Sequence, residues 1–179
     1  AGVLLDARRY SEALERLEEA EQRPDVSADL LGDIRFEKGR ALYQLHRERD
    51  AAQTFATLAA EQRSHTKAPQ AATLAFTLWG QVAEKSQRRE DYAALAATLQ
   101  NLLESYADHP QRVQAEWLLP VALQLAGEYD EAARRFDRVP ANSEHAEEAR
   151  YRAVVCQRQA LEAQRAKLAP DAYGKALRE

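Results

Sequence analysis

A short phrase recurs along the chain and constrains its fold more than any other feature. A tyrosine is followed three positions later by a small or apolar residue, starting at Tyr10, Tyr92, Tyr129 and Tyr173, and successive tyrosines are 82, 37 and 44 residues apart. Near the middle of the longest interval, the segment 50–55 keeps the small residues without the tyrosine. The chain therefore repeats about every 37–44 residues, a period typical of stacked supersecondary units.

The composition indicates that these units are helical. Among 179 residues there are 36 alanines but only nine valines and isoleucines together, six glycines and six prolines, so good helix formers dominate. Apolar residues follow helical spacing, as at Leu118, Leu119, Ala122 and Leu125. We predict an all-α fold. With 45% hydrophobic and 30% charged residues, the sequence fits neither intrinsic disorder nor a membrane span, so we expect no membrane insertion by this segment.

Helix boundaries can be placed from breaks and turns. Proline and polar clusters at 23–25, 64–69, 107–110, 139–143 and 169–171 predict breaks, and short polar turns at 7–9, 46–48, 87–89 and 126–128 predict antiparallel pairs. The sequence predicts one domain over 1–179 with helical hairpins at about 1–23, 27–63, 69–106, 111–139 and 144–179. Residues 161–167 carry no clear turn signal, so one long helix is an alternative there. Because the chain starts at Ala1 and contains no methionine, we expect it to be an excerpt of a longer protein.

The stretch from Ala115 to Phe136, followed by Pro140 and Ala149, carries the pattern most clearly. At these residues the chain resembles the tetratricopeptide repeat family, and the resemblance implies a right-handed α-solenoid of about five hairpins. The longer period and the linkers at 107–110 and 140–143 look like the variant in bacterial envelope proteins, such as outer-membrane assembly lipoproteins and Tol-Pal-associated periplasmic proteins. The compartment stays open between the cell envelope and the cytoplasm.

The resemblance also implies a working surface. In that family the first helix of each repeat lines a concave groove, which implies groove positions for Arg40, Tyr43, Gln44, Gln81, Glu84, Trp117, Val121 and Gln124. A guanidinium and an aromatic ring on one face, at Arg40 and Tyr43, would suit a peptide that carries a carboxylate. For Tyr43 and Trp117, packing between repeats is an equal alternative. We expect Trp79 in the core.

Catalytic and metal-binding patterns are missing from the sequence. The histidines His46, His65, His109 and His145 fall in turns or linkers without the i, i+4 spacing of a zinc site, and we expect His109 and His145 to be solvated loop residues. Acidic clusters mixed with arginine are typical of exposed helix faces, and there is no phosphate-binding glycine loop. A net charge of −4 without a basic patch argues against nucleic acid. We predict a protein that is not an enzyme and uses no metal and no cofactor.

The sequence therefore favours a non-catalytic scaffold that binds a partner protein or peptide. Two alternatives remain: a self-association or spacer segment, with a possible homo-oligomer, and a regulatory domain attached to a catalytic domain outside this chain. Small residues, including Gly39, Gly80 and Ala132, are expected where helices cross closely, and Cys156 is expected to be a buried, inert thiol.

Overall fold

The computed structural model describes residues 2–176, and within that range the chain forms eight α-helices and no strand. The all-α prediction is confirmed. The helices are α1 (Gly2–Glu21), α2 (Ala28–Gln44), α3 (Glu48–Glu61), α4 (Ala68–Ser86), α5 (Arg89–Ser105), α6 (Arg112–Ala126), α7 (Tyr129–Phe136) and α8 (Ala146–Ala176).

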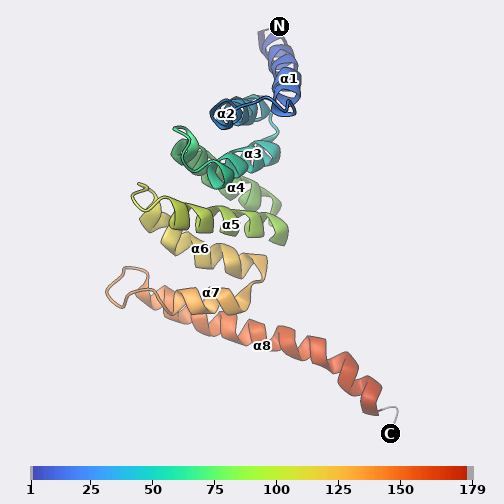
Figure 1. Cartoon of the computed structure of the whole chain (residues 1–179). Coiled ribbons are helices and arrows are strands. Elements are labelled where there is room, and N and C mark those ends of the chain that lie inside the picture. Colours follow the sequence, from blue (N-terminus) through green and yellow to red (C-terminus); the bar gives the residue numbers. More distant parts are fainter. Residues whose placement is uncertain (1, 177–179) are drawn as a thin grey trace.

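The helices are arranged in a row that follows the order of the chain. Each helix packs against the one before it and the one after it, and α3 also touches α5. Figure 1 shows the two ends of the chain at opposite ends of this elongated, repeat-like row. A single apolar core runs along it and contains Phe55, Leu99 and Phe136, the residues expected between neighbouring hairpins, together with Trp79 and Cys156. Because consecutive pairs share this core, each pair covers the apolar face of the next.

Three short turns join α2 to α3, α4 to α5 and α6 to α7, as predicted. Each contains one residue with left-handed backbone, His46 (φ 57°), Gln87 (φ 54°) and Gly127 (φ 90°), at intervals of 41 and 40 residues. In two of the turns, an amide bonds the carbonyl five positions earlier in the chain: Arg47 N–H donates to Leu42 O at 3.0 Å, and Glu128 N–H donates to Leu123 O at 2.9 Å. These turns have the geometry of a Schellman helix end.

The predicted turn at 7–9 and the predicted break at 169–171 are wrong, and the alternative of one long helix through residues 161–167 is confirmed. Helix α1 continues through Ala7-Arg8-Arg9, and α8 continues through Pro170, so each end of the row is one helix rather than a hairpin. Residues 3–21 contain neither glycine nor proline and are rich in good helix formers, so nothing there stops a helix. A single proline removes one amide hydrogen bond, and the helix persists on both sides of Pro170. Tyr10 and Tyr173 therefore lie inside helices, and only Tyr92 and Tyr129 mark helix starts.

His109, expected to be a solvated loop residue, is instead buried in a linker between helical pairs. His65 and His109 are buried, and the ring Nδ1 of each accepts a hydrogen bond from the amide two residues later, at 3.2 Å in both cases. Ser143 occupies the equivalent place in the third linker, where its Oγ accepts from the His145 amide at 3.2 Å. These side chains satisfy an amide that the first turn of α4, α6 or α8 leaves without a partner. His145 itself stacks on Trp117, with ring centroids 4.1 Å apart.

Candidate functional site

A depression of about 490 Å³ lies between α2 and α4. Its volume is within the usual range for ligand sites. We call it the α2–α4 depression. It is lined by Phe36, Arg40, Tyr43 and Gln44 of α2, Phe55 of α3, and Gln70, Leu74, Thr77, Leu78 and Gln81 of α4.

The floor of the α2–α4 depression is apolar and closely packed. Phe36 and Phe55 meet edge to face with their centroids 5.5 Å apart, and both rings are buried. Gly39 permits this arrangement, because a Cβ at its position would lie 2.7 Å from the Phe55 ring. The expectation of a small residue at this helix crossing is confirmed. The floor offers apolar surface that does not need to rearrange before binding.

The rim is polar and open to solvent. Arg40, Tyr43, Gln44 and Gln81 are all exposed, and the Tyr43 side chain keeps 47% of its surface accessible. A guanidinium has donors only, whereas a glutamine amide both donates and accepts hydrogen bonds. The rim can therefore hold a carboxylate and also pair with a peptide backbone above an apolar floor.

A network of charges borders this rim. The carboxylate of Glu37 lies 3.0 Å from Nη1 of Arg40 and 3.7 Å from Nζ of Lys67. Lys67 also bonds Asp33 at 2.9 Å and lies 5.0 Å from the centroid of the Phe36 ring. The hydrogen bond to Asp33 raises the pKa of Lys67 above its ordinary value despite slight burial, and the same bond lowers the pKa of Asp33. An anionic ligand at Arg40 would therefore compete with Glu37.

A second depression, of about 370 Å³, continues the same face between α4 and α6. Thr77 and Gln81 line both depressions, and Glu84 and Val121 line the second. Gly80 also lines it, and among the described residues a Cβ at this glycine would meet no atom within 4 Å. The expectation that Gly80 serves a close helix crossing is therefore wrong.

Two of the predicted groove residues, Trp117 and Gln124, line neither of these depressions. Trp117 lies in another cavity, of about 560 Å³, formed with α7 and the linker that follows it. Its ring meets Phe136 edge to face at 5.9 Å and stacks on His145, so it packs between helices. The Oε1 of Gln124 accepts a hydrogen bond from Arg152 of α8 at 3.0 Å.

Four of the eight predicted positions thus meet in the α2–α4 depression: Arg40, Tyr43, Gln44 and Gln81. Sequence reasoning missed the α4 residues Gln70, Leu74 and Thr77. They precede Gln81 by eleven, seven and four positions, which is one face of a helix. Extending the stripe backwards from Gln81 would have found them.

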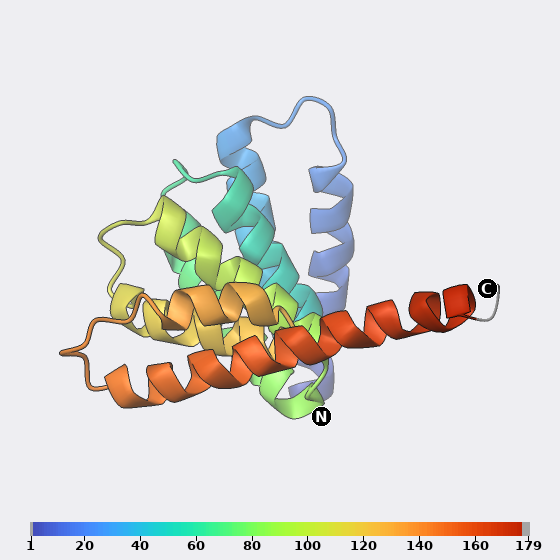
Figure 2. The same cartoon turned by 90° about the horizontal axis from the view of Figure 1, so that it is seen from below.

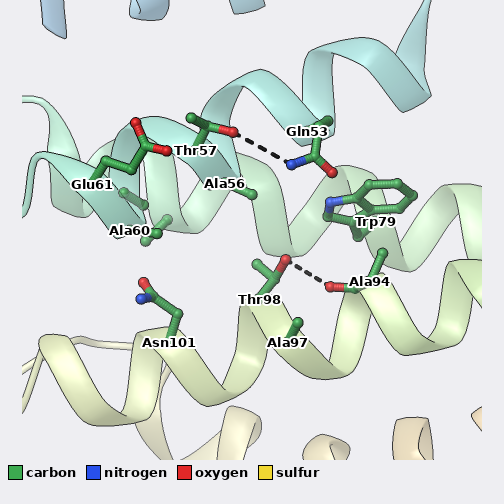
Figure 3. Close-up of a pocket in the computed structure, with 12 residues that line it drawn as sticks. Gln53, Ala56, Thr57, Ala60, Glu61, Trp79, Ala94, Ala97, Thr98 and Asn101 are labelled. Atoms are coloured by element: carbon green, nitrogen blue, oxygen red, sulfur yellow. Dashed lines mark hydrogen bonds between the residues drawn. The ribbon is translucent and has the colours of Figure 1, made fainter.

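Helices α3 and α5 border a smaller recess of about 310 Å³. Figure 3 shows Trp79 of α4 at its base, between Gln53 and Ala94, with alanine and threonine side chains along the two flanking helices. Gln53 Nε2 donates to Thr57 Oγ1 at 3.4 Å, and Thr98 Oγ1 donates to the Ala94 carbonyl at 2.9 Å. These polar groups are largely satisfied within their own helices, which leaves this recess poorer in free donors than the α2–α4 depression.

No family model, curated protein or solved structure matches the chain. Across residues 2–176, no helix is both long and apolar enough to span a bilayer. The described side chains contain no group of three or more histidine, cysteine, aspartate or glutamate residues placed to hold a metal ion.

Proposed function

We propose that the chain is a right-handed, tetratricopeptide-like α-solenoid that binds a partner protein or peptide and performs no catalysis. The periodic features of the backbone support this proposal. The left-handed turn residues recur every 40 or 41 residues, and the capping side chains His65, His109 and Ser143 recur in successive linkers. Helical pairs built to one plan and packed in sequence order are the defining feature of such solenoids.

The α2–α4 depression carries the functional part of the proposal. It combines a buried aromatic floor with an exposed tyrosine, a guanidinium and several amides. Binding surfaces typically place a few aromatic and arginine anchors around an apolar centre. The ligand we infer is a peptide segment that sets an apolar side chain over Phe36 and Phe55 and a carboxylate beside Arg40. The amides of Gln44 and Gln81 would then bond the peptide backbone.

A peptide selection tests this proposal. A decapeptide library with free terminal carboxylates and the same library with amidated termini are captured on the immobilised chain. We expect enrichment of carboxylate-bearing peptides, and we expect Tyr43→Ala combined with Gln81→Ala to abolish it. Gln100→Ala on α5 is the matched control, because Gln100 is exposed but lies outside the depression. Equal capture by both variants would rule out the α2–α4 depression.

Glu37 offers a second readout of the same proposal. The Glu37 carboxylate forms an ion pair with the Arg40 guanidinium at 3.0 Å. Glu37→Gln should therefore free the guanidinium for a ligand. We expect the selected carboxylate peptides to bind about threefold more tightly to Glu37→Gln, in line with the small energies of exposed ion pairs. The amidated peptides should show no gain, and a gain of equal size for both libraries would contradict recognition of a carboxylate.

A further inference from the structure

Helix α8 ends the row with one face uncovered. Its buried residues, Ala149, Ala153, Cys156 and Ala160, form one stripe, and α7 is the helix packed most closely on α8. On the opposite side Tyr151, Val154 and Leu161 are 71%, 64% and 59% exposed. Figures 1 and 2 both show the C-terminal half of α8 extending past the other helices. An apolar stripe left open at the end of a helical row is typical of an interaction surface.

The order of residues along this open stripe is regular. Glu147, Tyr151, Val154, Arg158, Leu161 and Arg165 follow one another at spacings of 4, 3, 4, 3 and 4 residues. This is the heptad spacing with which one helix packs along another. From Glu147 to Arg165 the stripe is about 27 Å long at the usual helical rise.

The stripe is complementary to itself in the antiparallel direction. When two copies of α8 are paired antiparallel about a two-fold axis beside residue 156, Glu147 lies opposite Arg165. Tyr151 then lies opposite Leu161, and the Arg158 stem lies opposite Val154. A parallel arrangement would instead place Glu147, Arg158 and Arg165 each opposite its own copy, and such like-charge contacts are unfavourable. The charges therefore select one direction and one register.

The remaining charges of the helix are compatible with this register. Glu148 and Glu162 approach each other across the pair, but each already has an arginine on its own helix, Arg152 at 2.7 Å and Arg158 at 3.6 Å. Within the described part of the chain, Glu147 and Arg165 make no ion pair and stay available. We propose that α8 is a homodimerisation element, in which the protruding half of each copy covers Tyr151 and Val154 of the other. This contact uses one surface twice, as two-fold dimers do.

A charge-swap series tests the pairing directly. The 179-residue chain and its variants are compared by sedimentation equilibrium over a wide concentration range. We expect Glu147→Arg alone and Arg165→Glu alone each to weaken dimerisation about tenfold through like-charge contacts. The double variant Glu147→Arg with Arg165→Glu should restore the dissociation constant to within about threefold of the parent value, because the pair is rebuilt with its signs exchanged.

Apolar and control variants complete the series. Leu161→Glu should also dissociate the dimer, whereas Leu30→Glu on α2, an exposed leucine far from α8 in the chain, should leave it intact. Circular dichroism establishes that each variant keeps its helices. A parent chain that stays monomeric at the highest concentration would overturn the proposal, as would a dimer indifferent to all three α8 substitutions or a double variant without recovery. None of these outcomes depends on peptide binding at the α2–α4 depression.

Discussion

At the scale of single residues, small features decide how each helix ends and how near its neighbour comes. The sequence allowed correct predictions for residues whose size alone sets their place, such as Trp79, Phe55 and Gly39. The burial of His65 and His109 could not be predicted from the sequence, because it depends on helices far away in the chain. His65 packs on Gly32, whose Cβ would lie 2.5 Å from the ring, and His109 bonds Thr73 at 3.0 Å.

The left-handed turn residues give a prediction about stability. His46 has φ 57° and an exposed side chain, and a residue with a Cβ pays a steric cost in this region that glycine does not. We expect His46→Gly to raise the free energy of unfolding by about 1 kcal/mol. Urea titration measures this. A destabilised variant would mean that the side chain makes a contact that outweighs the steric cost.

Two glycines in helix interiors should respond to alanine in opposite ways. At Gly80 a Cβ meets open space among the described residues, so Gly80→Ala should stabilise the chain by about 1 kcal/mol through helix propensity. At Gly39 the new methyl would stand 2.7 Å from the buried Phe55 ring, and overpacking of this kind costs about 1–3 kcal/mol. Thermal unfolding of the two variants side by side checks the prediction. Equal shifts in Tm would contradict the packing described for Gly39.

At the scale of helices, polar contacts between elements add to the shared core. The carboxylate of Asp91, at the start of α5, accepts hydrogen bonds from Nη1 and Nη2 of Arg49, at the start of α3. It also accepts one from the Ser86 hydroxyl at 2.6 Å. Helix boundaries were predictable where a turn residue or a proline cluster marked them. Two predictions failed: in α1, Ala7-Arg8-Arg9 resembled a turn but has good helix propensity, and in α8 the helix continues through Pro170.

Replacing Asp91 should lower the free energy of unfolding more than replacing an exposed aspartate does. The Asp91 side chain is only 1% exposed, so Asp91→Ala leaves Arg49 and Ser86 without their partner. We expect a loss of about 2 kcal/mol in the free energy of unfolding, the usual cost for hydrogen bonds to a charged group. The control is Asp25→Ala, because Asp25 and its partner Arg23 are both exposed and the loss of such a surface ion pair should leave the free energy of unfolding nearly unchanged. Comparable losses in urea titrations of both variants would show that the cluster contributes nothing special.

The junction of α1 and α2 should depend on pH. Burial opposes ionisation of Glu21, but hydrogen bonds from Lys38 and Arg35, both at 2.9 Å, lower its pKa below the ordinary value of 4.5. A carboxylate with a lowered pKa stabilises the fold above the unfolded-state pKa, and that contribution is lost as the pH falls through the folded-state value.

Glu21→Gln isolates this contribution. At pH 7 the variant should be less stable than the parent chain by up to about 1 kcal/mol. The difference should shrink as the pH falls below 4.5. Urea titrations of both proteins at several pH values measure it. A gap that stays constant down to pH 3 would contradict the ionised state of Glu21 as its cause.

At the scale of the whole molecule, an open row of helices leaves long surfaces and two ends exposed. The α2–α4 depression and its continuation toward α6 lie on the surface along the row, whereas the open face of α8 lies at its end. A receptor surface built from packed helices is ordered before a partner arrives, which lowers the entropic cost of binding. The four rim residues of the α2–α4 depression are half of the eight positions that the family resemblance implied. Trp117 lies elsewhere because its ring is held by Phe136 and His145, contacts that span 19 and 28 residues.

The most direct test of the central claim is a photo-crosslinking measurement. A benzophenone amino acid is placed at position 44, on the rim of the α2–α4 depression, or at position 100 on α5, and each protein is irradiated with the best peptide from the free-carboxylate library. A covalent adduct at position 44 and none at position 100 is the predicted result. Adducts of equal yield at the two positions, or none at position 44, would show that the partner binds elsewhere.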